Sequence, residues 1–307
     1  MLAFIPSPPD NAIHLGPLQL HAYGLMIALG VVAAVWLAGR RLEARGVGTK
    51  EDMSAIAMWA VPAGIVGARL YHVITDWKRF QGDWLRAFKI WDGGLGIWGG
   101  VALGLIVGLW AARKRGVTTA AALMAAAPAL PLAQAIGRVG NWWNQELFGR
   151  PSTLPWALKI DPNLRPPEYK DFATFHPAFL YEGLWNLALC AVLLRIDRKR
   201  DVGAGKLFAI YVAGYTFIRF FIEQMRVDFA SKILGLRVNE WVSGIVFFIA
   251  LAYLLTHRHQ KWVAPEPTVV DPEGEGLLPA EGIEDGLPAE EVETPDLVLN
   301  EGDPLVD

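Results

Sequence analysis

The residues best suited to chemistry gather in one short stretch, residues 137–149, with the sequence GRVGNWWNQELFG. It ends an almost purely apolar run that begins at residue 120, and it precedes the longest polar insertion in the hydrophobic part of the chain. Arginine, asparagine, glutamine and glutamate side chains are costly in lipid, so they must pair with one another or face a wet cavity. The stretch therefore predicts either a polar site or a helix end that anchors at the membrane interface.

Other polar side chains recur at one end of the predicted helices. On one of these helices the spacing i, i+4, i+8, i+11 places four side chains along one face. The side chains outside the 137–149 stretch are Tyr23, Arg69, His176, Glu182, Tyr215, Arg219, Glu223 and Arg226. We expect all of them in the outer half of the membrane, close to Arg138, Asn141 and Glu146.

Buried arginines need anionic partners. The arginines expected at the site are Arg69, Arg138, Arg219 and Arg226, and the carboxylates that could pair with them are Glu146, Glu182 and Glu223. Guanidinium groups pair bidentately with carboxylate or phosphate. Near the outer leaflet the most available anion is a phospholipid headgroup. The alternative is an arginine–glutamate lattice that only locks the helices together.

The elements that must position these groups are membrane-spanning helices. The chain is 53% hydrophobic with a mean hydropathy of +0.29, which is too apolar for an ordinary soluble domain. Apolar runs predict spans near residues 20–39, 54–75, 95–112, 119–137, 177–195, 204–222 and 240–256. The expected fold class is an all-α polytopic membrane protein with about seven transmembrane helices.

Basic clusters predict the orientation. They follow the first, third, fifth and seventh spans, near Arg40, Arg113, Arg195 and Arg258. The positive-inside rule makes that face cytoplasmic, with the amino terminus outside and the carboxyl terminus inside. A fifth basic group contradicts this pattern because it falls in an outer loop: Lys78, Arg79, Arg86 and Lys89.

Four segments are expected. Residues 1–19 form an outer-face segment without the charged start of a signal peptide, and residues 20–256 form the transmembrane body. Within the body, residues 143–176 form a small outer-face head. Residues 257–307 form a cytoplasmic tail that we expect to be disordered, because positions 263–307 carry 14 acidic side chains and no lysine or arginine.

Several other functions are disfavoured by the sequence. Cys190, the single cysteine, is expected to be a small buried hydrophobe. The glycine-rich run at residues 91–100 lacks the lysine of a phosphate-binding loop, and its glycines are explained by close helix packing. No residues have metal-ligand spacing. We expect no cofactor, no metal and no nucleic-acid partner.

Six motifs in register resemble one family. Residues 137–149 are similar to the signature of prolipoprotein diacylglyceryl transferases, and the other motifs follow in the family's order over residues 17–256. They are residues 21–26, 67–70, 91–100, 176–182 and 219–226. The resemblance implies seven spans with an outer head, in the bacterial plasma membrane. It also implies transfer of a diacylglyceryl group from phosphatidylglycerol to the lipobox cysteine of a prolipoprotein, which forms a thioether and releases glycerol phosphate.

The resemblance also implies residue roles. The catalytic residues would be Arg138, Arg219, Tyr23, Glu146, His176 and Glu182. The phosphatidylglycerol-binding residues would be Arg138, Asn141, Tyr215, Arg219, Glu223, Arg226 and Arg69. Within these sets Arg138 and Arg219 would hold the phosphate, and Tyr23 and Asn141 would orient the headgroup. The nucleophile would be the substrate's own cysteine.

One position departs from the family pattern. Many members carry histidine before the final glycine pair of the 91–100 run, and this chain has Trp98. A tryptophan cannot act as a general base, so either another group serves or that histidine is not the base in this branch. Trp98 and the acidic tail together resemble members from high-GC Gram-positive bacteria.

Two other classes remain open on composition alone: a multi-pass transporter or lipid receptor, and a different phospholipid-headgroup transferase. A transporter built from duplicated halves should show an internal repeat, and none is evident. The motif register favours the lipoprotein transferase.

The acidic tail has two interpretations, a cytoplasmic protein contact or a solvated end. Deleting residues 263–307 separates them. Unchanged activity and membrane level, measured by transfer assay and immunoblot, would exclude the contact, whereas a loss of either would exclude the purely solvated end.

Overall fold

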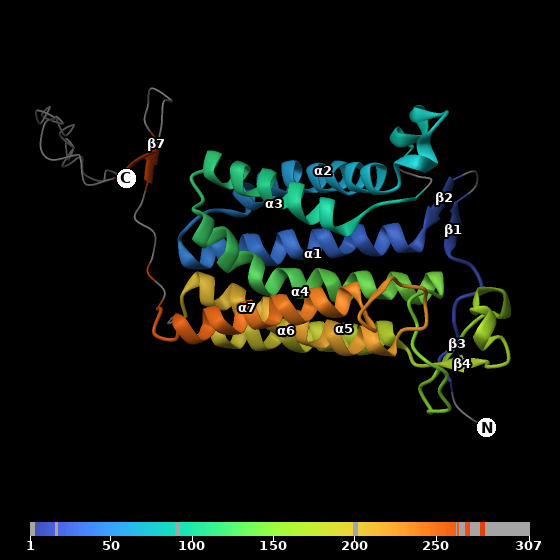
Figure 1. Cartoon of the computed structure of the whole chain (residues 1–307). Coiled ribbons are helices and arrows are strands. Elements are labelled where there is room, and N and C mark those ends of the chain that lie inside the picture. Colours follow the sequence, from blue (N-terminus) through green and yellow to red (C-terminus); the bar gives the residue numbers. More distant parts are fainter. Residues whose placement is uncertain are drawn as a thin grey trace, which may run out of the picture. The chain divides into compact units, whose positions relative to one another are not determined.

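A computed structural model describes residues 4–15, 18–89, 93–198, 202–261, 263, 268–270 and 277–279. The chain divides into two compact units, Met1–Pro265 and Glu266–Asp307. The first unit contains the helical body and every predicted site residue, so it positions the site (Figure 1).

Seven helices in the described part of the first unit are long and apolar enough to cross a membrane. They are α1 (Ala22–Arg45), α2 (Lys50–Thr75), α3 (Ile97–Lys114), α4 (Thr119–Asn144), α5 (Ala178–Arg198), α6 (Ala204–Met225) and α7 (Val238–Thr256). The predicted seven-helix polytopic fold is confirmed. The helices extend up to seven residues beyond the predicted spans because their polar ends continue the helical backbone past the apolar runs.

Local sequence signals fix several of the helix ends. The Thr49 hydroxyl accepts a hydrogen bond from the Asp52 backbone N–H, and the Asp52 carboxylate accepts one from the Thr49 N–H, so a capping box starts α2. Gly46 ends α1 in the left-handed conformation with φ 65°. Gln145 takes the same conformation with φ 51° and ends α4 directly before the polar turn of the 137–149 stretch.

The helices pack in neighbouring pairs. The closest partners are α2 with α3, α1 with α4, α4 with α5, and α6 with α7. A Cβ atom at Gly67 on α2 would overlap the carbonyl oxygen of Gly99 on α3, and one at Gly99 would overlap the carbonyl oxygen of Gly67. The glycines of this run therefore allow close helix packing, as expected.

The short elements and the polar loops gather at one end of the bundle, on the right in Figure 1. The amino-terminal hairpin joins β1 (Ala12–Leu15) to β2 (Leu18–His21), and the α6–α7 connection carries β5 (Lys232–Ile233) and β6 (Leu236–Arg237). The α2–α3 connection carries the short 3₁₀ helices η1 (Trp77–Phe80) and η2 (Trp84–Phe88). This end therefore holds all the material that could build a site outside the helices.

The head is a small folded cap at the same end. It contains β3 (Leu158–Lys159) paired with β4 (Thr174–Phe175) and two 3₁₀ turns, η4 (Pro162–Leu164) and η5 (Pro167–Tyr169). Its core consists of Phe148, Leu158, Ile160 and Phe175. The backbone of Ile5 bonds to Ala157 and Lys159, so the amino-terminal segment packs on the head.

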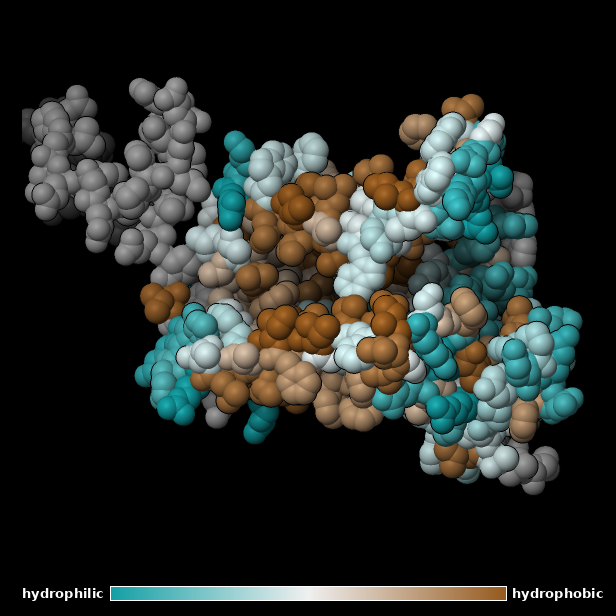
Figure 2. Space-filling view, in the orientation of Figure 1, coloured by the Kyte–Doolittle hydropathy of each residue, from teal (hydrophilic) through white to brown (hydrophobic). Residues whose placement is uncertain are grey.

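The surface of the first unit has the polarity of a membrane protein. Figure 2 shows a hydrophobic band over the middle of the helices and hydrophilic residues at both of their ends. Water would penalise such a band, whereas lipid covers it at no cost. The chain is therefore a multi-pass membrane protein.

In the second unit β7 (Thr268–Val270) pairs antiparallel with β8 (Leu277–Pro279). Most of the tail for which disorder is predicted lies outside the described residues.

The α2–α3 contact predicts a stability difference between two glycines. Gly67→Ala places a methyl group against backbone atoms that cannot move aside, at a cost of about 1–3 kcal/mol. We expect a lower melting temperature in detergent for Gly67→Ala. The control Gly244→Ala places its methyl group in open space on α7 and should leave melting unchanged or raise it slightly. Equal melting of the two variants would contradict the close contact.

Candidate active site

One buried carboxylate joins three helices at the centre of the polar end. Glu182 on α5 pairs with Arg138 on α4, with 2.6 Å between Oε1 and the Arg138 Nη2. Its other oxygen lies 3.6 Å from Nη1 of Arg219 on α6. Because the Glu182 side chain is only 2% exposed, its charge is tolerated only with these two partners.

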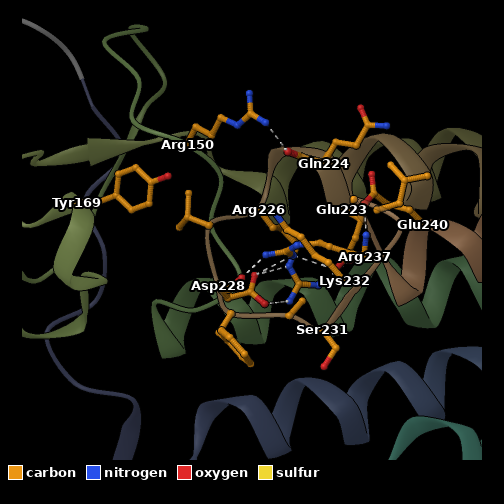
Figure 3. Close-up of a pocket in the computed structure, with 15 residues that line it drawn as sticks. Arg150, Tyr169, Glu223, Gln224, Arg226, Asp228, Ser231, Lys232, Arg237 and Glu240 are labelled. Carbon is orange, nitrogen blue, oxygen red and sulfur yellow. Dashed lines mark hydrogen bonds and ion pairs between the residues drawn. The ribbon is translucent and has the colours of Figure 1, made fainter.

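A second buried carboxylate, Glu223, continues the network along α6. Its Oε2 lies 2.5 Å from Arg219 Nη2 and 3.3 Å from Arg226 Nη1. Its Oε1 lies 2.9 Å from Nη1 of Arg237, which comes from the far end of the α6–α7 connection (Figure 3). The i, i+4 spacing predicted from the sequence thus produces the Arg219–Glu223 pair.

Asp228 completes the network outside the helices. Its carboxylate accepts a forked pair from Arg226, 2.7 Å from Nε and 2.8 Å from Nη2 (Figure 3). Arg237 donates to the Asp228 backbone carbonyl. Burial raises the pKa of the Asp228 carboxyl, but the bond from Arg226 and the charges of Arg226 and Arg237 outweigh it, so the pKa lies below its ordinary value.

The 137–149 stretch supplies a polar chain beside Arg138. Arg138 Nη1 donates to Asn141 Oδ1 at 3.1 Å, and Asn141 Nδ2 donates to Glu146 Oε1 at 2.7 Å. The turn after α4 brings Glu146 back, because Gln145 and Leu147 both have positive φ and the Glu146 N–H bonds to the Asn141 carbonyl. Local backbone conformation therefore places Asn141 between an arginine and a glutamate.

Two tyrosines flank the arginines. Tyr23, in the first turn of α1, packs against Gly140, and its hydroxyl interacts with Glu146, Arg138 and Asn141. Tyr215, one turn before Arg219 on α6, interacts with Glu182 and Arg138. Both tyrosines therefore join the predicted cluster.

The cationic groups, rather than the carboxylates, remain accessible. The side chains of Arg138 and Arg219 are 20% and 15% exposed, whereas those of Glu182 and Glu223 are 2% and 1% exposed. The arginines line a narrow cleft between α4, α5 and α6 that has no room for a water molecule in this structure, with Asn141, Phe179 and Glu182 among its walls. The exposed side of the network therefore presents guanidinium groups rather than carboxylates, which suits it to an anion.

A larger cavity of about 740 Å³ lies over the Arg226 end of the network (Figure 3). Arg150 and Tyr169 of the head line it together with the α6–α7 connection. Glu223 and Arg226 contribute to this cavity, and Arg226 also lines the smaller one. The head therefore borders an approach to the arginine network.

Two predicted site residues lie apart from this network. Arg69 donates to the backbone carbonyls of Ala87 and Gly94 in the α2–α3 connection. His176 lines a cavity in the head, and its Nδ1 lies 3.1 Å from the Tyr181 hydroxyl. The described contacts do not bring either residue to Arg138.

Asp228 and Arg237 belong to the network but were not predicted from the sequence. Both lie in the short connection between α6 and α7, just outside the helical face from which the site was predicted. An arginine directly before an apolar span and an aspartate two residues after Arg226 were the available signals. The β5–β6 hairpin returns Arg237 to Glu223, and a pairing that depends on a hairpin cannot be read from helical spacing.

Metal binding finds no support in this part of the chain. No group of three or more His, Cys, Asp or Glu side chains among the described residues could hold a metal ion. The two buried glutamates already bind arginines.

The fold and the network define a class: a polytopic membrane protein with an arginine-rich charge network at one end of its helical bundle. The sequence model of the family described as prolipoprotein diacylglyceryl transferase matches residues 10–256. The chain belongs to this family.

Named relatives agree with that assignment. A phosphatidylglycerol–prolipoprotein diacylglyceryl transferase of Frankia alni is 52% identical over 84% of this chain and 68% of its own length. A second, of Streptomyces coelicolor, is 50% identical over 84% of this chain and 83% of its own length. A third, of Paenarthrobacter aurescens, is 51% identical over 83% of this chain and 84% of its own length. The relatives are mostly actinobacterial, which confirms the predicted branch.

Asp228 predicts a pH-dependent contribution to stability. The pKa of the Asp228 carboxyl is lower in the folded protein than its ordinary value of 3.8. The ionised carboxylate therefore stabilises the folded protein at any pH above 3.8. This contribution is lost as the pH falls through the lowered pKa. At neutral pH we expect Asp228→Asn to lower the melting temperature by about 2–4 °C, which corresponds to roughly 1 kcal/mol in a chain of this size.

In thermal melts of wild type and Asp228→Asn, the difference in melting temperature should stay constant from pH 7 to about 4 and narrow as the pH falls below 3.8. The matched control is Asp171→Asn, an exposed carboxylate of the head with no described ion pair. The stated role of Asp228 would be contradicted if the difference in melting temperature grew on acidification. It would also be contradicted if Asp171→Asn lowered the melting temperature as much as Asp228→Asn.

Proposed function

We propose that this chain transfers the diacylglyceryl group of phosphatidylglycerol to a cysteine thiol of a prolipoprotein, and that the arginine network is its active site. The observation that supports this proposal is the arrangement of charge: partly exposed guanidinium groups pair with buried carboxylates. An enzyme that displaces a phosphate ester from a lipid needs cationic groups held rigidly where negative charge develops.

Arg138 and Arg219 bind the phosphate in this proposal. They approach from two helices and share Glu182, which fixes both guanidinium groups. Asn141 and Tyr23 lie beside Arg138 and orient the headgroup through their amide and hydroxyl groups. Glu223 pairs with Arg219 and also with Arg226, and Tyr215 interacts with Arg138.

The reaction balances as a nucleophilic substitution at carbon. The sulfur of the substrate cysteine forms a bond to the terminal glycerol carbon of the diacylglyceryl group. The bond between that carbon and the phosphate oxygen breaks, and the oxygen keeps the electron pair. Glycerol phosphate leaves with the added negative charge, which Arg138 and Arg219 stabilise. The thiol proton passes to a base or to water.

The nucleophile belongs to the substrate, so the enzyme needs no cysteine of its own. Cys190 is buried in α5 next to the basic end of the bundle, which agrees with a packing role. The thiolate is the reactive form of the substrate cysteine, and the positive field of the arginines favours it. Glu146 accepts hydrogen bonds from Asn141 and Asn144 and has no arginine partner in the described contacts, so it is our candidate to accept the proton.

The predicted roles of Arg69 and His176 remain untested, and both residues lie apart from the arginine network. The family resemblance assigns Arg69 to phosphatidylglycerol binding and His176 to catalysis. In the described contacts His176 orients Tyr181, whose hydroxyl also accepts from Trp156. This arrangement favours a positioning role at the junction of the head and α5.

The proposed location is the bacterial plasma membrane, with the site toward the outer leaflet, the amino terminus outside and the carboxyl terminus in the cytoplasm. The support is the opposition between the site and the basic helix ends. Arg45, Arg113 and Arg198 lie at the ends of α1, α3 and α5 that are farthest from the site. The lipobox segment of a secreted substrate would then reach the site from outside, past the head.

The test combines purified protein, phosphatidylglycerol and a lipobox-cysteine peptide, with the peptide mass as readout. We expect a gain of one diacylglyceryl group and no gain for a Cys→Ser peptide. Arg138→Ala should slow transfer by about 100-fold or more, because a group that stabilises transition-state charge is lost. Arg138→Lys keeps a charge for Glu182 but loses the planar fork, so it should also be slow while folding normally.

The matched control is Arg258→Ala, an exposed arginine beyond α7 at the other end of the bundle. It should leave the rate unchanged. Phospholipid binding without any transfer by the folded wild type would favour the receptor or transporter class instead. Full activity of Arg138→Lys would remove the role assigned to the guanidinium fork.

A further inference from the structure

The α2–α3 connection contains a second cationic cavity that the proposed reaction does not use. We call residues 76–89 the arm. They carry four cationic side chains and two carboxylates, and they are the exception to the basic-cluster pattern of the other loops. A basic loop on the outer side of a membrane protein calls for a local explanation.

The cavity measures about 270 Å³ and lies between the end of α2 and the arm. Its walls are Arg69, His72, Arg79, Phe80, Arg86, Gly93 and Gly94. None of these residues lines the cavities around Arg138 and Arg226. Figure 1 shows the arm and the head at separate places on the same end of the bundle.

Arg69 places a buried positive charge in the wall. It is 8% exposed, and its guanidinium donates to four carbonyl oxygens, including those of Arg86 at 2.6 Å and Ala87 at 2.7 Å. These bonds fix the arm but supply no negative charge. No carboxylate among the described residues pairs with Arg69, so its positive charge is balanced only by carbonyl dipoles and adds to the positive potential of the cavity.

The other walls favour a phosphate-sized anion. Arg79 and His72 share one carboxylate, Asp76, at 3.9 and 4.0 Å, which is too distant for a hydrogen bond. Asp76 is not among the residues of the wall. At Gly94, with φ 76°, a Cβ atom would overlap the His72 ring and approach Arg69, so only glycine keeps this space open.

Apolar side chains on the arm point to a lipid rather than a soluble anion. Trp77, Trp84, Leu85 and Phe88 are between 48% and 78% exposed, although they stand among cationic residues. Figure 2 shows hydrophobic and hydrophilic residues mixed in this region, at the edge of the hydrophobic band. Tryptophan with arginine and lysine is the usual composition of a membrane interface.

We propose that the arm cavity binds the phosphate of one anionic phospholipid in the outer leaflet, with Arg69, Arg79 and Arg86 as its cationic walls. The acyl chains lie along the exposed apolar side chains of the arm. The ligand is bound and does not react, since nothing in the cavity resembles the Arg138 network. The inference concerns binding alone and does not rest on the proposed transfer reaction.

Native mass spectrometry of the full-length protein in detergent, titrated with phosphatidylglycerol, tests this proposal. Arg79 and Arg86 are exposed, so the double variant Arg79→Glu/Arg86→Glu should fold normally. We expect it to lose one bound phospholipid, with an affinity about tenfold or more weaker, because charge-assisted hydrogen bonds are removed. The matched control is Lys78→Glu/Lys89→Glu, which changes the arm's charge equally at positions outside the cavity wall.

The control should retain that lipid, and the neutral variant Arg79→Gln/Arg86→Gln should lose it. The same loss on an Arg138→Ala background separates this site from the proposed active site. Equal loss of bound phospholipid in both charge-reversal variants would show that general surface charge causes the effect, and it would contradict binding in the cavity. Equal binding of phosphatidylcholine, or displacement by soluble glycerol phosphate, would overturn the anionic-lipid ligand.

Discussion

The structure depends on the pairing of buried charges inside a membrane bundle. An isolated guanidinium or carboxylate in hydrocarbon is too costly to persist, so Glu182 and Glu223 each bind more than one arginine. This constraint joins α4, α5, α6 and the α6–α7 hairpin, because each contributes a charge that the others need. Removing one member would leave its partners with fewer opposite charges, so the network contributes to the stability of the fold.

The pairing scheme also determines what the site can do. An arginine–glutamate lattice that only locked helices would cover its charges completely. Here the carboxylates are buried behind the arginines, and the Arg138 and Arg219 side chains remain partly accessible. The lattice can therefore lock the helices and, in the proposed function, also bind an anion, so the two interpretations left open by the sequence are compatible. Electrostatic preorganisation of this kind needs no reorganisation when negative charge develops.

Three separate segments lie at the polar end of the bundle, and each has its own position relative to the arginine network. The head borders the approach to Arg226, the 137–149 turn aligns Asn141 and Glu146, and the arm carries its own cationic cavity. A phospholipid and a peptide must meet at one point for the proposed transfer. A bundle end with one side at the interface and a folded cap on another provides a surface for each.

The sequence by itself determined the seven spans and the class of protein, and it predicted most members of the charge network, because apolar length and helical spacing are local properties. The series Arg219, Glu223 and Arg226 could be placed on one helical face from their numbers alone. Tertiary structure decided the rest. It separated Arg69 and His176 from Arg138, and it added Asp228 and Arg237 through a hairpin. Pairing between helices depends on how they pack and on where loops return, and one-dimensional spacing carries no information about either.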